Sequence, residues 1–109
     1  MTIEHADAVD FVTFEYKSGD ALLTISDHLS WDECEDEHLL FLQNKINSYL
    51  RFIESGEIYK KFPEANGRKI VINIAGKFPL SVRAKIFLER ASTAIQQAGF
   101  LLKFNLFEL

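Results

Sequence analysis

The feature that most constrains the fold of this sequence is a helical repeat of apolar residues between Glu37 and Ser55. Its large apolar side chains recur at steps of three and four, which places them on one face of an α-helix. A second stripe of this kind runs from Val82 to Ala98, after Ser81, whose hydroxyl suits a helix N-cap. Both predicted helices need an apolar surface to cover. The first stripe consists of Leu39, Leu42, Ile46, Tyr49, Leu50 and Ile53.

Four strands are predicted to supply that surface. Val9–Tyr16 and Ala21–Ser26 favour strand and are joined by turn-forming residues around Gly19, so we expect a β-hairpin. Arg68–Ile74 and Phe100–Phe107 each alternate between apolar and more polar side chains. Strands of this kind are typical of a sheet that is covered on one face.

The predicted order of elements is therefore ββαβαβ within a single α+β domain, residues 1–109. We expect a two-layer sandwich in which two helices pack on one face of a four-stranded mixed sheet. If the strand from Arg68 pairs in parallel with the strand from Phe100, their crossover through the second helix should be right-handed. The predicted core combines helix and sheet residues: Leu39, Leu42, Ile46, Leu50 and Ile53 with Ile70, Ile72, Leu102 and Phe104.

Composition narrows the class of protein. The chain has 109 residues, 48% of them apolar, which is enough to form a core without a disulfide or a metal. It has no run of 18 apolar residues and no apolar N-terminal segment, so we expect neither a membrane span nor a secretory signal. Cys34 is the single cysteine, which favours a reducing, cytoplasmic location. We expect no cofactor.

Charge is distributed unevenly along the chain. Residues 1–40 carry eleven acidic residues and one lysine, a net charge of −10, whereas residues 41–109 carry +6 and the whole chain −4. This split is compatible with an acidic partner-binding face, with a basic one, or with two halves that neutralise each other. The sequence pI of about 5.3 argues against nucleic acid as a partner.

The candidate binding residues lie in the acidic segment that joins the hairpin to the first helix. We predict that Asp27–Glu33 is irregular and largely exposed, because its charges could not be buried without partners. Trp31 either closes the end of the core above Leu29 and Leu39 or anchors an interface; we favour the core position. The full candidate binding set is Asp27, His28, Trp31, Asp32, Glu33, Glu35 and Asp36.

Metal-ligand residue types also gather in this segment. His28, Cys34 and His38 are the candidates, and Cys34 and His38 would share a helix face if the helix included Cys34. Structural zinc sites draw ligands from two separate elements, so we predict no metal and interpret these residues as structural. A catalytic thiolate at Cys34 is disfavoured by the neighbouring Glu33 and Glu35.

Several segments resemble a family of small bacterial proteins known only as a domain of unknown function. The resemblance rests on Ile25-Ser26-Asp27-His28-Leu29, Trp31, the run from His38 to Leu50, and the run from Phe52 to Tyr59. It implies a bacterial, cytoplasmic, stand-alone domain and supplies no catalytic residue, cofactor or partner. Size and charge are also similar to those of immunity proteins of bacterial toxin systems, which is an analogy only.

Two functional hypotheses follow, together with one on assembly. The first is a non-enzymatic interaction domain that presents Asp27–Glu37, with Trp31, to a basic protein partner. The alternative is a small metal-binding or ligand-binding protein, or an enzyme, that uses His28, Cys34 and His38. The open sheet face is expected to carry outward apolar residues, with Phe11 or Val12 added according to the hairpin register. A homodimer through this face would cover them, and we favour it over the alternative, in which residues Phe107–Leu109 fold back over the face within one chain. The outward residues are Val71, Leu101 and Phe107.

Overall fold

The computed structural model of the chain describes residues 12–106. A hairpin of β1 (Thr13–Phe14) and β2 (Ala21–Asp27) is followed by helix α1 (Glu35–Glu54) and a short helix α2 (Glu57–Lys61). A single 3₁₀ turn (Pro63–Ala65) leads into β3 (Ile70–Gly76), which is followed by helix α3 (Val82–Gln97) and strand β4 (Leu101–Leu106). The predicted α+β order is confirmed, with α2 as an additional short element.

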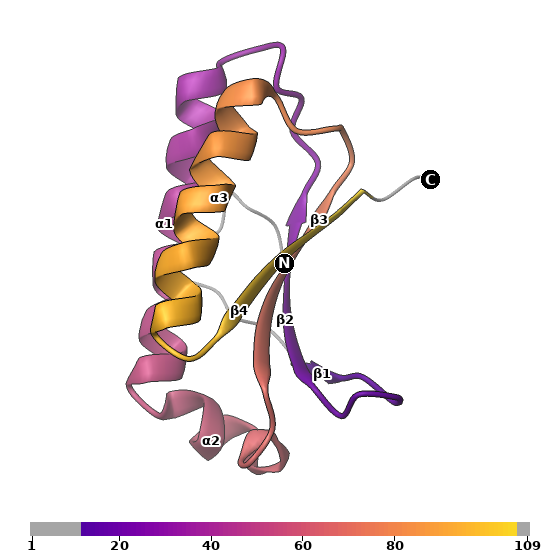
Figure 1. Cartoon of the computed structure of the whole chain (residues 1–109), viewed down its shortest axis with the longest axis vertical. Helices are drawn as coiled ribbons and strands as arrows, with labels where there is room; N and C mark the ends of the chain where they lie inside the picture. Colours follow the sequence, from indigo (N-terminus) through magenta and orange to yellow (C-terminus); the bar gives the residue numbers. More distant parts are fainter. Residues whose placement is uncertain (1–11, 107–109) are drawn as a thin grey trace.

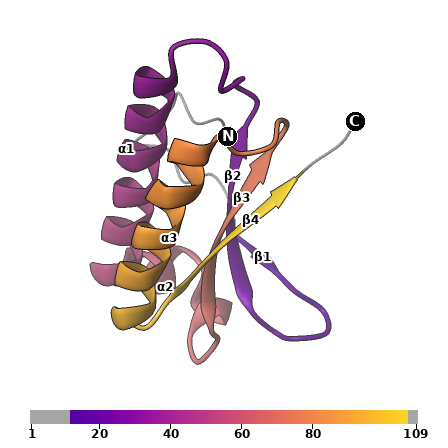
Figure 2. The same cartoon turned by 45° about the horizontal axis from the view of Figure 1, so that its top comes forward.

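The four strands form one mixed sheet in the order β1-β2-β3-β4. β1 and β2 are antiparallel, whereas β2 with β3 and β3 with β4 are parallel. The register places Leu22, Val71 and Leu101 side by side across the sheet. Figure 1 shows α1 and α3 on the same side of the sheet, and the tilted view of Figure 2 confirms that both long helices cover one face. The parallel pairing of the last two strands is confirmed.

The core lies between this helix layer and the sheet. Leu42, Ile46 and Ile53 of α1 are buried as predicted, as are Ile70 and Ile72 of β3. The other predicted core residues are partly buried and pack against the core: Leu39, Leu50, Leu102 and Phe104.

The centre of the buried face of α1 differs from the predicted stripe. His38, Leu42, Lys45, Tyr49 and Phe52 are all buried and follow each other at steps of three and four. The buried face of α1 therefore includes two polar residues, His38 and Lys45, which a prediction from apolar residues alone leaves out. Lys45 is fully buried, and its Nζ lies 5.5 Å from the centroid of the Tyr49 ring.

The open face of the sheet is less exposed than the alternating pattern predicts. Val71, which points away from the helices, is fully buried, and its neighbours Leu22 and Leu101 are partly buried. Asn73 and Asn105 are joined by a side-chain hydrogen bond on this face. The predicted first strand before Val12, and the predicted outward residues Phe11 and Phe107, lie outside the described residues.

Candidate functional site

The loop from β2 to α1 follows Asp27, the last residue of β2, at the carboxyl end of a parallel strand. Such ends are where open α/β sheets commonly bind ligands. The backbone oxygen of Asp27 accepts a hydrogen bond from the Lys77 amide at 2.9 Å, so the strand includes Asp27. The expectations that the strand ends at Ser26 and that Asp27 is exposed are wrong, because the Asp27 side chain is buried. Burial is tolerated because the carboxylate is hydrogen-bonded on both oxygens.

His38 in the first turns of α1 is the main partner of this carboxylate. Its Nε2 lies 2.8 Å from Oδ1 and 2.6 Å from Oδ2 of Asp27, and the Leu29 amide also donates to Oδ1 at 3.2 Å. Both side chains of the pair are 2% exposed. Among the described residues, His38 Nδ1 is buried without a hydrogen-bond partner.

Trp31 completes this arrangement from the loop. Its ring stacks on the His38 imidazole with the centroids 3.5 Å apart and an interplanar angle of 15°. Trp31 is 7% exposed, so it occupies the core position rather than an exposed interface position. We name Asp27, His38 and Trp31 the buried cluster. It ties the end of β2, the middle of the loop and the start of α1 together.

The remaining acidic residues surround the buried cluster at the surface. Asp32, Glu33, Asp36 and Glu37 are exposed, and Glu35 is partly exposed. The loop itself is locally ordered, because the Asp32 amide donates to the Ser30 hydroxyl at 3.1 Å.

Arg83 at the start of α3 neutralises part of this charge. Its guanidinium lies 2.6 Å from an Asp36 carboxylate oxygen and 3.0 Å from one of Glu35. The hydrogen bond to Asp36, followed by its charge and by the bond to Glu35, raises the pKa of Arg83. No ion pair of Asp32, Glu33 or Glu37 occurs within residues 12–106. Uncompensated negative charge therefore remains next to the loop.

A cavity of about 230 Å³ opens between this loop and α1. Leu29 and Phe41 supply apolar walls, whereas Glu33 and Glu37 supply carboxylates. We name this cavity the acidic pocket. Its complete lining is Leu29, Ser30, Glu33, Cys34, Glu37, His38 and Phe41.

Cys34 stands where the loop becomes helix. It has a left-handed backbone, with φ 47° and ψ 50°, and its side chain does not cap α1. Its carbonyl oxygen accepts a hydrogen bond from the His38 amide at 2.9 Å, and its thiol is exposed and free. A positive φ is uncommon outside glycine, so the loop is held in an unusual backbone shape at the pocket wall.

The structure brings the predicted site residues together only in part. Asp27 and Trp31 lie in the buried cluster, and Glu33 and Cys34 line the acidic pocket. His28, Asp32, Glu35 and Asp36 do not line this pocket.

The three metal candidates are also separated. Cys34 and His38 share the pocket wall, but His28 is not part of it. His38 instead engages Asp27 through Nε2. In the part of the chain that the structure describes, no group of three or more His, Cys, Asp or Glu residues is arranged to hold a metal ion.

The predicted binding set did not include Leu29, Glu37 or Phe41. The sequence carries a signal for two of them, because Glu37 and Phe41 follow helical spacing with His38 and so share one face of the first turns of α1. Leu29 has no such signal, since its position depends on the loop conformation in which its amide donates to Oδ1 of Asp27.

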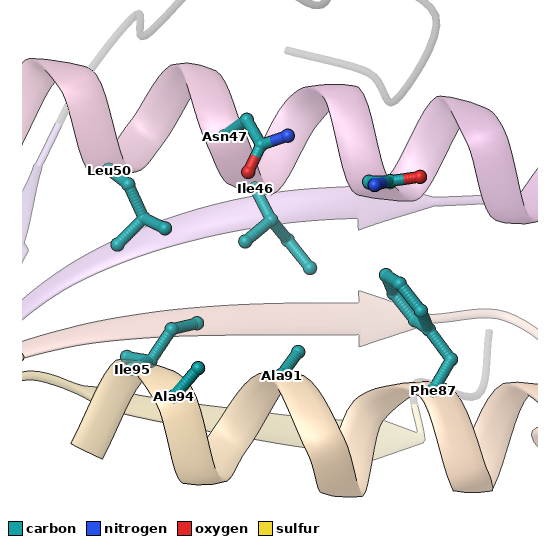
Figure 3. A pocket seen from close by; sticks show the side chains of 8 residues that line it. Ile46, Asn47, Leu50, Phe87, Ala91, Ala94 and Ile95 are labelled. Carbon is teal, nitrogen blue, oxygen red and sulfur yellow. The ribbon is translucent and has the colours of Figure 1, made fainter. Parts of the chain in front are cut away.

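Other cavities lined by described residues border the helices. Figure 3 shows a groove of about 190 Å³ between α1 and α3, into which Ile46, Phe87 and Ile95 point. Its polar lining is limited to Gln43 and Asn47, so it offers no titratable group for chemistry. A further cavity, of about 440 Å³, lies between α3 and β4, and its lining includes Lys85 and Glu89.

Comparisons with known proteins place the chain in a family. No curated protein and no solved structure matches it. No helix within residues 12–106 is long and apolar enough to cross a membrane. A family model matches residues 1–108, in agreement with the resemblance seen in the sequence. The chain belongs to a family of unknown function (DUF6572).

Proposed function

We propose that this protein is a non-enzymatic interaction domain whose acidic pocket accepts a lysine or arginine side chain of a basic protein partner. The observation that carries the proposal is the pocket itself. It combines apolar walls from Leu29 and Phe41 with the carboxylates of Glu33 and Glu37, which form no ion pair within residues 12–106.

The lining of the pocket matches the two parts of a long basic side chain. Lysine and arginine carry an apolar stem and a charged end, and the stem is stabilised by apolar contact while the charge stays near solvent. Leu29 and Phe41 are placed to contact the stem, and the carboxylates of Glu33 and Glu37 to bind the charged end. A shorter or apolar side chain would leave one of the two surfaces unused.

The exposed acids outside the pocket act at longer range. Asp32 adds negative charge beside Glu33, and Asp36 is 85% exposed although it contacts Arg83. Charges of one sign on one surface raise the rate of encounter with a basic partner and make it depend on salt concentration.

The buried cluster supports this function by fixing the pocket before the partner arrives. Asp27 and Trp31 both contact His38, which fixes the loop against α1. The loop therefore loses little conformational entropy when a ligand binds. Their role is to position the loop, and their burial excludes direct contact with a large partner.

The class of protein that we propose resembles bacterial immunity proteins, which are small acidic domains that block a basic toxin. The support is size, charge and the acidic pocket. We also propose a bacterial cytoplasmic location, because the exposed thiol of Cys34 is suited to a reducing compartment.

The test uses two short peptides that differ in one side chain. One carries a single lysine between glycines, and the other carries norleucine, which keeps the stem and lacks the charge. Chemical shifts of the Leu29 and Phe41 amides should change in a saturable way with the lysine peptide at low salt, and not with the norleucine peptide. Unchanged shifts with lysine, or equal shifts with both peptides, would refute the proposal.

Matched variants locate the binding. Glu33→Gln with Glu37→Gln should abolish the response, whereas Glu54→Gln, an exposed acid near the other end of α1, should leave it intact. Cys34 gives a second readout, because an occupied pocket should slow alkylation of its thiol. An equal loss in the Glu54 variant would show a response to net charge alone and would contradict a specific pocket.

A further inference from the structure

Strand β4 lies at one edge of the described sheet, so one of its two sides has no neighbouring described strand. It pairs in parallel with β3, and no described strand pairs with its other edge. None of its residues is fully buried, whereas five of the seven residues of β3 are. The outer backbone N–H and C=O groups of β4 are therefore available for hydrogen bonds to another strand.

The sequence of β4 has few of the features that protect an edge strand. Its six residues, Leu-Leu-Lys-Phe-Asn-Leu, include no proline, and its single charge is Lys103 on the open face of the sheet. Leu106 is 46% exposed. Native edge strands that avoid pairing usually carry proline, a bulge, an inward charge or charged side chains such as lysine, and Lys103 is the one such feature of β4. β4 instead has the apolar composition of a strand that is paired on both sides.

The groove beside this edge is suited to the side chains of an added strand. It lies between α3 and β4, has a volume of about 440 Å³, and has apolar walls from Leu80, Leu88 and Phe104. Figures 1 and 2 show α3 as the long helix nearer to β4. A strand added to β4 would point every second side chain towards this groove, which is how strand addition combines backbone bonds with side-chain recognition.

The charges in the groove identify the occupant. Lys85 and Glu89 lie one turn apart on α3, are exposed, and form no ion pair within residues 12–106. If two copies of the chain met at this groove around a two-fold axis between Lys85 and Glu89, Lys85 of each copy would lie opposite Glu89 of the other. The same axis passes between β4 and its copy, beside Phe104, because Leu88 and Phe104 line one groove. The surface is therefore complementary to itself, as an isologous interface requires.

We propose that the occupant is a second copy of this chain. β4 pairs antiparallel with β4 of the second copy, which joins the two sheets into one continuous sheet with both α3 helices on the same face. Lys85 and Glu89 form two symmetric ion pairs across the axis. This interface is distinct from the acidic pocket, and it also differs from a dimer through the open sheet face, which would leave the β4 edge unpaired.

The test measures self-association of the full chain by sedimentation equilibrium at low ionic strength. Lys85→Glu and Glu89→Lys each place like charges opposite one another twice per dimer, so each should weaken dimerisation by roughly tenfold. The double variant K85E/E89K restores both pairs with reversed polarity and should regain the original affinity to within about threefold. Arg90→Glu, exposed on α3 but outside the groove lining, is the matched control and should change little.

Two further results discriminate between interfaces. Protection of β4 amides from hydrogen exchange should rise with protein concentration. A protein that is monomeric at all concentrations would overturn the proposal and leave the edge to an extended segment of another protein. Dimerisation that is abolished by Leu101→Lys and unaffected by the Lys85 and Glu89 variants would also overturn it, and would assign the interface to the open sheet face.

Discussion

Asp27 is the residue on which the shape of the acidic pocket depends most. Its carboxylate binds His38 and the Leu29 amide, and its backbone continues the sheet towards Lys77. A buried carboxylate is tolerated only while such partners remain in place, because its desolvation is otherwise uncompensated. The same contacts that stabilise the fold thus also orient Leu29 on the pocket wall.

We expect Asp27→Ala to lower the free energy of unfolding by about 2 to 5 kcal/mol, because it leaves the buried His38 with neither ring nitrogen satisfied. Urea denaturation measures the loss. Asp32→Ala on the same loop is the control, since Asp32 is exposed, and should stay within about 0.5 kcal/mol of the parent. Equal effects of the two substitutions would show that the Asp27–His38 contact is not formed in solution.

Gly76 at the end of β3 shows how closely the last strand packs. A Cβ atom there would lie 2.5 Å from Cε1 and 2.8 Å from Cζ of Phe104. We expect Gly76→Ala to destabilise the protein by about 1 to 3 kcal/mol, because the Phe104 ring must move. The effect should shrink in a Phe104→Leu background, and a double-mutant cycle measures this coupling. Additive effects would rule out the clash as the cause.

At the scale of elements, α1 links the core to the acidic pocket. One face of the helix carries Leu42, Ile46 and Tyr49 against the sheet, while its first turns carry Glu37 and His38 at the pocket, next to the preceding Cys34. Any loss of packing along α1 therefore also affects the pocket.

Two leucines on α1 test this packing directly. Leu42 is fully buried and Leu40 is 52% exposed, so they differ in environment but not in chemistry. Leu42→Ala should lower the free energy of unfolding by about 2 to 5 kcal/mol, and Leu40→Ala by less than about 0.5 kcal/mol. Denaturant titration of both variants gives the answer. A loss below about 0.5 kcal/mol for Leu42→Ala is incompatible with the packing described.

Elements were predictable from the sequence where apolar periodicity is strong. α3 and β4 begin and end within one residue of the prediction, and Ile70, Ile72 and Ile74 lie on the buried face of β3. The predicted start of α1 at Glu37 is late by two residues, because acidic residues in the first turn, such as Glu35, are favoured by the helix dipole rather than by apolar spacing.

The candidate site was predictable only in part, because its geometry depends on buried polar residues. Hydropathy places Asp27 and His38 at the surface, and only their contact across eleven residues of sequence makes their burial favourable. Lys45 is missed for the same reason. The exposure of Glu33 agrees with the sequence, since no ion pair within residues 12–106 compensates its charge.

At the scale of the whole molecule, one core connects all described elements. The core cluster includes Trp31 from the loop, Tyr49 from α1, Ile58 from α2, Ile72 from β3 and Leu88 from α3. Such continuity is typical of domains that unfold in a single cooperative transition.

Trp31 makes this cooperativity measurable, because it is the single tryptophan and its ring stacks on His38. We expect urea unfolding followed by tryptophan fluorescence to coincide with unfolding followed by far-ultraviolet circular dichroism, which reports on the helices. The midpoints should agree within experimental error. A fluorescence transition at clearly lower urea would mean that the loop detaches before the core unfolds, contrary to its anchoring by the buried cluster.

The strand order β1-β2-β3-β4 is also the order in which the strands leave the ribosome. Each new strand can therefore add beside the one made just before it, and none has to insert between two strands that are already paired. β3, the most buried strand, can pair with β2 while α3 is still being synthesised. β4 arrives last of the described strands and covers the edge of β3 that is still open, so the sheet grows at one edge only while β1 stays at the other.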